Sequence, residues 1–149
     1  MTDLFTSCLY DNTSFYPAFQ KDLQRAQRSI LIESPFITLR RMEALLPVLS
    51  RLSERGIRTV VNTKNPNEHD MEYKLQALET IYLLQEMEVK VLYTVKHHRK
   101  LAIIDDEILW VGSLNILSQN DSCEIMRRTV SQQVASEMVR FIGARRWFR

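Results

Sequence analysis

Apolar side chains in the first two thirds of the chain recur alternately at helical spacing and in short continuous runs. Helical spacing indicates an amphipathic helix, and a short run bounded by polar or turn residues indicates a buried strand. The pattern predicts three helices, at residues 14–27, 42–55 and 70–87. It predicts a strand after each of them, at residues 29–36, 57–62 and 89–94. Such an alternation is typical of a sheet covered by helices, with crossovers that make neighbouring strands parallel.

The pattern changes in the last third of the chain. Two short apolar runs, 100–104 and 108–111, are separated only by an acidic turn, which predicts a β-hairpin. A last strand is expected at residues 124–128, followed by a closing helix at residues 130–142. The side chains of that helix that we expect to face inward are Val134, Met138 and Phe141.

The length and composition are those of one globular domain. A chain of 149 residues can bury a hydrophobic core but is too short for two domains. With 45% apolar and 26% charged residues, and few Gly or Pro, it contains no low-complexity or disordered stretch. We therefore predict a single domain over residues 1–149, an α/β/α sandwich with a mixed, mostly parallel central sheet.

Membrane and disulfide-rich classes are not favoured by the sequence. No apolar run approaches the roughly 20 residues that cross a bilayer, and residues 1–10 lack the order of a signal peptide. We therefore expect a cytoplasmic protein with no membrane partner. Cys8 and Cys123 are far apart without CxxC spacing, which favours two reduced thiols over a disulfide or a zinc site.

The net charge of +2 hides basic clusters at residues 96–100, 127–128 and 140–149. A polyanionic partner such as nucleic acid would explain these clusters, but a solvated basic face is the more common reason for them. Charge alone therefore leaves both interpretations open.

The residues that can carry chemistry lie in segment 97–115, HHRKLAIIDDEILWVGSLN. His98 and Lys100 are two residues apart, so on a strand they project from the same face toward one spot. A neutral imidazole is a nucleophile and a lysine is a compact cation, which together suit attack on a phosphodiester. This chemistry requires no metal ligand and no cofactor.

Three small residues complete the segment. Gly112 permits close approach of another backbone where the second hairpin strand ends, and Ser113 and Asn115 supply small donors nearby. The whole pattern, His98-x-Lys100-x4-Asp105-x6-Gly112-Ser113-x-Asn115, resembles the complete HKD signature of the phospholipase D superfamily. A chance match at six positions is improbable; the alternative is that His98 and Lys100 are surface residues of a hairpin.

The resemblance extends beyond the motif. Segment 15–38, the strand that contains residues 62–64, and segment 112–128 are similar to the phospholipase D-like domains attached to superfamily 1 DNA helicases and to some restriction-type nucleases. It therefore covers nearly the whole chain.

The resemblance implies a covalent phosphohistidine mechanism. His98 would attack phosphorus, and the histidine of a second motif would protonate the leaving oxygen and then activate water. The chain has only one motif, because His69 lies in a loop without the following lysine and His97 belongs to the same copy. The resemblance therefore implies a homodimer in which one His98 from each subunit meets the other.

The resemblance also assigns roles to the other motif positions. Lys100 and Asn115 of both subunits would bind the phosphoryl oxygens, and Ser113 would help to hold them. Glu124 would accept a proton from the other ring nitrogen of the histidine and fix its tautomer. Asp105 is interpreted as a structural residue that supports the hairpin turn.

Five further residues are weaker candidates. His97 should face away from His98, which favours a surface residue or one that only supports the site. Arg40 and Arg41 follow a strand end and could overhang the site. Arg127 and Arg128 are candidates for phosphate contacts, although either arginine pair could simply be solvated.

The leading hypothesis is a metal-independent nuclease or phosphodiesterase acting on DNA rather than RNA, with a helicase or a larger parent chain as its candidate partner. A second hypothesis is a phospholipid hydrolase or phosphatidyltransferase, since the same histidine chemistry serves lipids. The absence of an amphipathic anchor and of a second motif argues against it. A third is a nucleic-acid-binding module of a helicase or defence system with little cleavage of its own.

Overall fold

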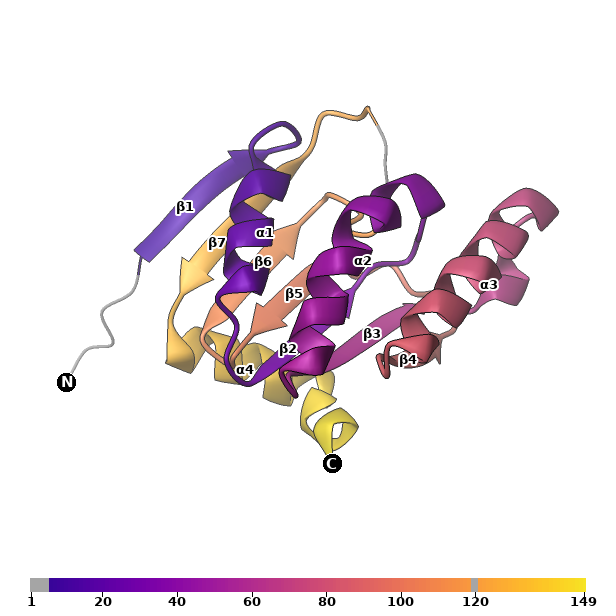
Figure 1. The fold of residues 1–149 in the computed structure, drawn as a ribbon. Coiled ribbons are helices and arrows are strands. Elements are labelled where there is room, and N and C mark those ends of the chain that lie inside the picture. The colour runs from indigo at the N-terminus through magenta and orange to yellow at the C-terminus, as the bar shows by residue number, and fades with distance from the viewer. Residues whose placement is uncertain (1–5, 119–120) are drawn as a thin grey trace.

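The structure is a computed structural model that describes residues 6–118 and 121–149. These residues form a seven-stranded sheet with helices on both faces: Figure 1 shows α1, α2 and α3 side by side on one face and α4 on the other. The strands are β1 (Thr6–Asp11), β2 (Ser29–Glu33), β3 (Arg58–Lys64), β4 (Lys90–Thr94), β5 (Leu101–Ile104), β6 (Ile108–Gly112) and β7 (Ile125–Val130). The helices are α1 (Phe15–Gln24), α2 (Leu39–Glu54), α3 (Met71–Glu86) and α4 (Gln132–Ile142), with short 3-10 helices η1 (Pro66–Glu68) and η2 (Ala144–Phe148). The predicted sandwich is confirmed.

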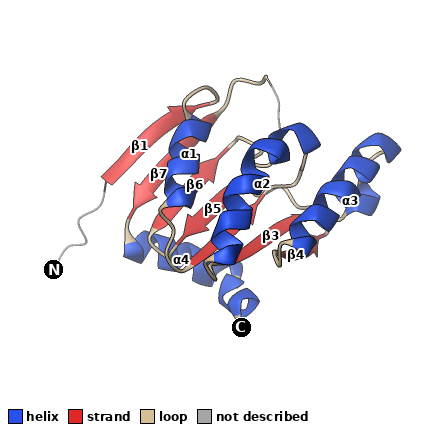
Figure 2. Cartoon of the chain, in the orientation of Figure 1, coloured by secondary structure: helices blue, strands red, loops and turns tan. Residues whose placement is uncertain are grey.

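The strand order is β1-β7-β6-β5-β2-β3-β4. Only β2, β3 and β4 are parallel neighbours, because α2 and α3 connect them by crossovers (Figure 2). The four other pairings in the described sheet are antiparallel. The sheet is therefore mixed as predicted, but "mostly parallel" was wrong, because β5, β6, β7 and β1 all pair antiparallel with their neighbours and β5 lies beside β2 rather than beside β4.

Two hydrophobic clusters hold the layers together. The larger one lies between the sheet and α1, α2 and α3, and Trp110 is its largest fully buried side chain. The Phe15 ring meets the Trp110 ring edge-on with centroids 4.9 Å apart, and the Trp110 indole donates a hydrogen bond to Asp22 at 2.8 Å. The smaller cluster lies under α4 and η2. Each face of the sheet therefore buries apolar side chains against helices, which makes the sheet the central layer of the sandwich.

Two local expectations were wrong. β1 was not predicted, because its sequence TSCLYD has no apolar run and most of its residues are exposed at the edge of the sheet. In α4, Phe141 is 86% exposed rather than inward, and Ala135 and Val139 are the buried positions. The buried stripe of α4 is therefore rotated by about one residue from the expected one, and Val134 and Met138 lie at its margin.

The fold gathers several loops on the side of the sheet where β2, β3 and β4 end. We call this side the sheet edge, as distinct from the edge strands β1 and β4. The carboxyl ends of β2, β3, β4 and β6 lie there, beside the amino ends of β5 and β7. The loops after β2 and β6 are joined directly, because Thr38 N donates to the Leu117 carbonyl at 2.9 Å and Leu117 N donates to Ser34 Oγ at 3.1 Å. Within the described residues, no helix is both long and apolar enough to cross a membrane.

Candidate active site

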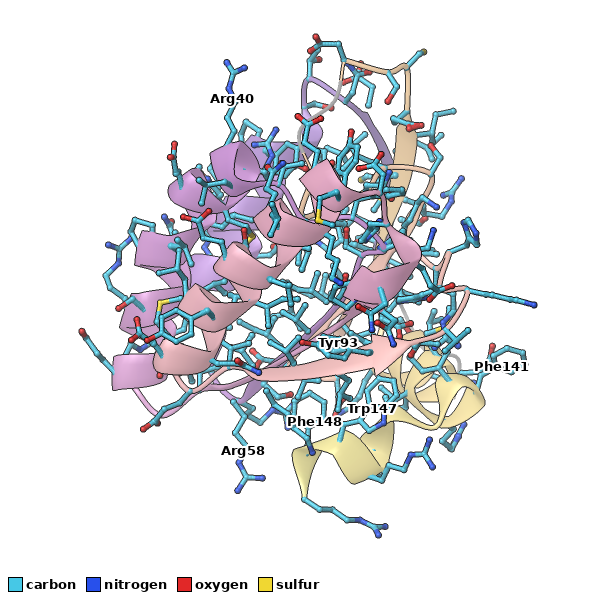
Figure 3. The ribbon with its side chains drawn as sticks, turned by 90° about the vertical axis from the view of Figure 1, so that its right-hand side faces the viewer. Arg40, Arg58, Tyr93, Phe141, Trp147 and Phe148 are labelled. Carbon is cyan, nitrogen blue, oxygen red and sulfur yellow. The ribbon has the colours of Figure 1, made fainter. Side chains whose placement is uncertain are left out.

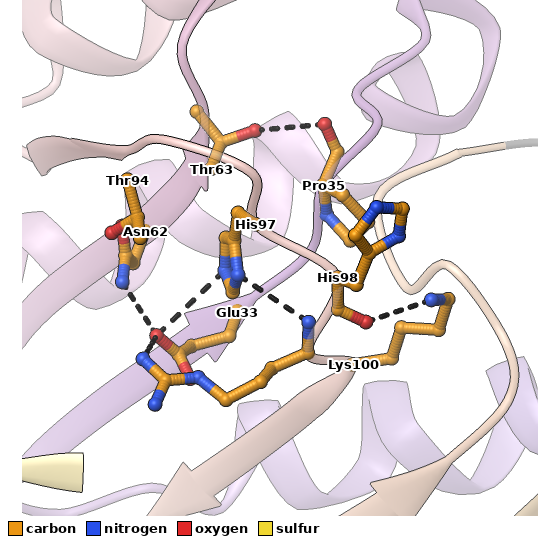
Figure 4. Close-up of polar contacts among 9 residues, drawn as sticks. Glu33, Pro35, Asn62, Thr63, Thr94, His97, His98 and Lys100 are labelled. Atoms are coloured by element: carbon orange, nitrogen blue, oxygen red, sulfur yellow. Dashed lines mark hydrogen bonds and ion pairs between the residues drawn. The ribbon is translucent and has the colours of Figure 1, made fainter.

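His98 and Lys100 lie at this sheet edge, in an extended segment that precedes β5 rather than in the hairpin strand itself. His98 is exposed and Lys100 is partly exposed. The Lys100 ammonium donates a hydrogen bond of 2.8 Å to the main-chain carbonyl of His98 (Figure 4). The cation is therefore held beside the histidine, where both are open to a ligand.

At Gly112 the backbone of β7 approaches β6 closely. A Cβ atom at Gly112 would lie 2.1 Å from the Ile125 carbonyl oxygen and 2.9 Å from Met126 Cα, both of them backbone atoms. The neighbouring Ser113 continues this contact, since its N–H donates to the Ile125 carbonyl at 2.9 Å and its hydroxyl accepts from Ile125 N at 3.0 Å. The Ser113 hydroxyl thus joins the ends of two strands at the border of the site.

Asn115 stands at the start of a loop that is tied to α1. The Tyr16 hydroxyl donates to the Ile116 carbonyl at 2.6 Å. The side-chain oxygen of Asn115 is buried and has no hydrogen-bond partner among the residues that the structure describes. Buried polar atoms of this kind are rare in folded proteins, and a ligand or a second subunit could satisfy this one.

Glu124 is half-buried and immediately precedes β7, the strand that pairs with β6. Among the described residues, no hydrogen bond joins its carboxylate to His98. Its predicted role as the partner of the imidazole stays a prediction.

A buried polar cluster that the sequence analysis missed lies under the motif (Figure 4). The Glu33 carboxylate, at the end of β2, is fully buried and accepts a hydrogen bond of 2.5 Å from the Asn62 amide of β3. Arg99 binds the same carboxylate through Nε at 2.9 Å and Nη2 at 3.0 Å. His97 Nε2 lies 3.7 Å from Glu33 Oε2, and His97 Nδ1 accepts from Arg99 N at 3.3 Å. The segment that carries His98 is thereby fastened to β2 and β3.

The charges of this cluster are set by burial. Burial raises the pKa of Glu33, and the neighbouring Arg99 guanidinium and Asn62 amide oppose this rise. Burial, together with the positive charge of Arg99, lowers the pKa of His97 to about 4. His97 is therefore neutral near pH 7. It is only 2% exposed, so the expectation that it lies on the surface was wrong, and the alternative of a supporting residue agrees with its contacts.

One signal in the sequence could have revealed the cluster. Glu33 interrupts the apolar run at residues 29–36 that was predicted as a buried strand, and Asn62 ends the next predicted strand. Charged groups are rarely fully buried unless they are paired. The two residues are direct partners in the parallel register of β2 and β3, which a single sequence does not reveal.

Asp105 lies at the opposite end of β5 from Lys100. Its carboxylate accepts hydrogen bonds from the main-chain N–H groups of Gln27, Arg28 and Ser29, at distances from 2.7 to 3.1 Å. Its own N–H donates to the Ser29 carbonyl at 2.8 Å. Asp105 thus ties the hairpin turn to the start of β2, which is a structural contact remote from His98.

The four candidate arginines differ in their surroundings. Arg40 is exposed and points away from the body of the protein (Figure 3). The Arg41 guanidinium lies 3.2 Å above the Tyr16 ring, and burial lowers its pKa.

The other two arginines are on β7. Arg127 donates to Ser7 Oγ at 2.6 Å on the exposed side of this strand. Arg128 forms two hydrogen bonds of 2.8 Å with the buried carboxylate of Asp22. Arg128 therefore has a structural partner, unlike Arg40.

No group of three or more His, Cys, Asp and Glu side chains in residues 6–118 and 121–149 is arranged to hold a metal ion. The carboxylate of Glu33 binds Arg99 and that of Asp105 binds main-chain N–H groups, so both already have partners within the chain.

The sheet order and the placement of the motif define a class of protein. A family model described as "Cardiolipin synthase, PLD-like domain" matches residues 19–147, which is most of the chain. The chain belongs to the phospholipase D-like family, as the resemblance of its motif indicated. A comparison with curated proteins gave no match.

Solved structures share the fold at low sequence identity. NucT from Helicobacter pylori is 19% identical with a TM-score of 0.72, and the alignment covers 93% of each chain. Nuc from Salmonella typhimurium, a phospholipase D family member, is 13% identical with a TM-score of 0.74, covering 93% of this chain and 91% of that one. TrmBL2, an archaeal chromatin protein with a novel mode of DNA binding, is 15% identical with a TM-score of 0.65, covering 92% and 50%. At these identities the likeness concerns the fold.

Proposed function

We propose that this protein is a metal-independent phosphodiesterase that cleaves DNA through a covalent phosphohistidine, with an active site shared between two subunits. The observation that carries the proposal is that His98 and Lys100 lie together at the sheet edge: residue His98 is exposed, and the Lys100 ammonium is bound to its main-chain carbonyl. Family membership makes a phosphodiester the expected substrate class.

The reaction needs two steps. In the first, a ring nitrogen of His98 forms a bond to phosphorus while the bond to the leaving oxygen breaks, and a second imidazole gives that oxygen a proton. In the second, the same imidazole removes a proton from water, the water oxygen bonds to phosphorus, and the bond to His98 breaks. Lys100 and the Asn115 amide would stabilise the charge that develops on the phosphoryl oxygens.

The second imidazole has no source within one subunit. The chain has three histidines. His97 is buried against Glu33, and His69 packs its ring against Phe36 with centroids 5.1 Å apart. A second copy of His98 across a two-fold axis would supply the missing group. The unsatisfied oxygen of Asn115 would also meet new partners there.

DNA is favoured over other phosphodiesters by two observations. TrmBL2, which shares the fold, is a DNA-binding protein. The exposed Arg40 and Arg127 are available to contact phosphates beside the site.

The proposal is tested by incubating the protein with plasmid and single-stranded DNA in EDTA. We expect cleavage that is lost in His98→Ala and in Lys100→Met and kept in Lys21→Met, which removes an exposed lysine of α1. Cleavage that persists in His98→Ala contradicts the proposal.

The shared site has its own test. The chain should elute as a dimer from a sizing column, and His98→Ala should inhibit the wild type when the two are mixed. After free exchange of equal amounts, about a quarter of the dimers carry two His98 residues, so total activity per wild-type chain should fall to about half. Full activity in a strict monomer would contradict the dimer.

A lipid substrate is the second candidate, because the family model that matches is described as a cardiolipin synthase domain. Release of headgroups or exchange of phosphatidyl groups on phospholipid vesicles, lost in His98→Ala, together with no action on DNA, would favour it. Tight DNA binding without cleavage of either substrate would instead favour a binding module.

A further inference from the structure

An aromatic cluster that has no role in the proposed reaction borders the candidate active site. It consists of Phe36, His69 and Tyr73, from the loop after β2, the loop before α3 and the first turn of α3. Their ring centroids lie 5.1 Å apart for Phe36 and His69, 5.7 Å for Phe36 and Tyr73, and 6.2 Å for His69 and Tyr73. The Lys64 ammonium lies 5.5 Å from the centroid of the Phe36 ring.

The aromatic cluster lies at the same sheet edge as His98. Thr63 Oγ1 donates to the Pro35 carbonyl at 3.4 Å, so Phe36, after the end of β2, lies beside Lys64, the last residue of β3. Glu33, three residues before Phe36, is the carboxylate that fastens the segment of His98. The cluster and the imidazole are thus attached to the same two strand ends, β2 and β3.

The rings are open enough to meet a ligand. Tyr73 is 41% exposed, and Phe36 and His69 are partly exposed. Burial and the nearby Lys64 lower the pKa of His69, which keeps its ring neutral. Two acidic neighbours oppose this shift, and each carboxylate holds a main-chain N–H: Glu68 accepts from Lys96 N at 3.0 Å, and Asp70 accepts from Tyr73 N at 3.0 Å. The Lys64 ammonium offers a negatively charged strand a cation beside the cluster.

We propose that the aromatic cluster stacks an unpaired base of a single-stranded nucleic acid whose phosphodiester lies at His98. This inference rests on the proposed function and names its substrate class. Aromatic side chains bind bases without regard to sequence, because every base has a π-face. A duplex keeps its bases stacked on one another, so a stacking site beside the catalytic edge selects unpaired strands.

The test measures binding in the His98→Ala background, where no cleavage occurs. The probes are a fluorescent single-stranded DNA oligonucleotide, the same strand with abasic sites in place of the central nucleotides, and a blunt duplex. Tyr73→Ala removes the most accessible ring, and Tyr73→Phe keeps it. Tyr82→Ala is the matched control, because Tyr82 is an exposed tyrosine of the same helix that makes none of the ring contacts of the cluster.

We expect Tyr73→Ala to weaken binding of the intact single strand about five-fold to a hundred-fold, the range for one lost stacking contact. Binding of the abasic strand and the duplex should stay the same, and Tyr73→Phe and Tyr82→Ala should bind as the background protein does. Equal loss on intact and abasic strands, or no loss at all, overturns the inference. This outcome is distinct from failure of the proposed function, which would be read from cleavage in the wild type: base-dependent binding without cleavage leaves the stacking site intact.

Discussion

Glu33 Oε1 and Arg99 Nε lie 2.9 Å apart, with the carboxylate fully buried at the end of β2 and the Arg99 side chain 43% exposed. Because β5 begins only at Leu101, this ion pair and the buried His97 ring hold the segment that presents His98. A buried charge is tolerated only where its partners remain, so the pair couples the stability of the fold to the geometry of the site.

Removing the guanidinium should therefore destabilise the protein. Arg99→Met leaves the Glu33 carboxylate buried without its cation, and we expect a loss of about 2–4 kcal/mol in the free energy of unfolding at pH 7. The deficit should shrink as pH falls, since the raised pKa of Glu33 lets the carboxyl take up a proton. Urea unfolding from pH 7 to pH 5 checks this, with Arg51→Met, an exposed arginine of α2, as the control. A deficit that does not vary with pH would contradict the explanation.

Neutralising both partners should be milder than removing one. Glu33→Gln keeps the shape of the side chain without its charge, so the double variant Glu33→Gln/Arg99→Met no longer buries an unpaired carboxylate. We expect it to recover at least about 1 kcal/mol relative to Arg99→Met alone. Chemical unfolding of the four proteins gives the coupling energy, and strict additivity would argue against a direct interaction.

The neutral His97 ring predicts a specific pH dependence. Its folded pKa of about 4 lies below the ordinary 6.5, so the unfolded chain binds more protons between these values and stability is lost as pH falls from about 6.5 to 4. His97→Asn keeps an acceptor for Arg99 N and removes this titration. The variant should therefore lose up to about 3 kcal/mol less than the wild type over that range. If stability, measured by thermal or urea unfolding, varied with pH equally in the two proteins, this explanation would be refuted. The titration of Glu33 is present in both proteins, so the difference between them reports on His97.

Gly112 should tolerate no side chain. In Gly112→Ala the new Cβ meets backbone atoms of Ile125 and Met126, so β6 and β7 must separate, at an expected cost of about 3 kcal/mol or more. Gly56→Ala is the control: Gly56 has φ +79° but open space around it, and only about 1 kcal/mol should be lost. Similar midpoints of unfolding for the two variants would contradict the close approach.

Arg128 and Arg40 should separate stability from nucleic-acid binding. Arg128→Met leaves the Asp22 carboxylate with the Trp110 indole but without its cation, so we expect a loss of about 2 kcal/mol in stability and no change in the salt dependence of DNA binding. Arg40→Met should leave stability unchanged and lower the slope of log affinity against log salt by about 0.7–0.9. If Arg128→Met lowered the salt slope of DNA binding and Arg40→Met did not, Arg128 rather than Arg40 would be the phosphate contact.

Most helices and strands could be predicted because their apolar residues repeat at the spacing of the element. β1 could not, since an exposed edge strand needs no apolar run and is held by main-chain bonds to β7. The antiparallel majority of the sheet was also missed, because the place of β5 beside β2 is chosen by packing between segments about 70 residues apart.

The sequence by itself determined the order of elements from α1 onward and a motif whose spacing identifies the family, because both depend on residues close together in the chain. Only the tertiary structure decided that Glu33, Asn62, His97 and Arg99 share one buried cluster and that Phe36, His69 and Tyr73 share another. Each set joins residues from separate loops and strands, and such contacts arise only when the sheet order brings those segments to one edge.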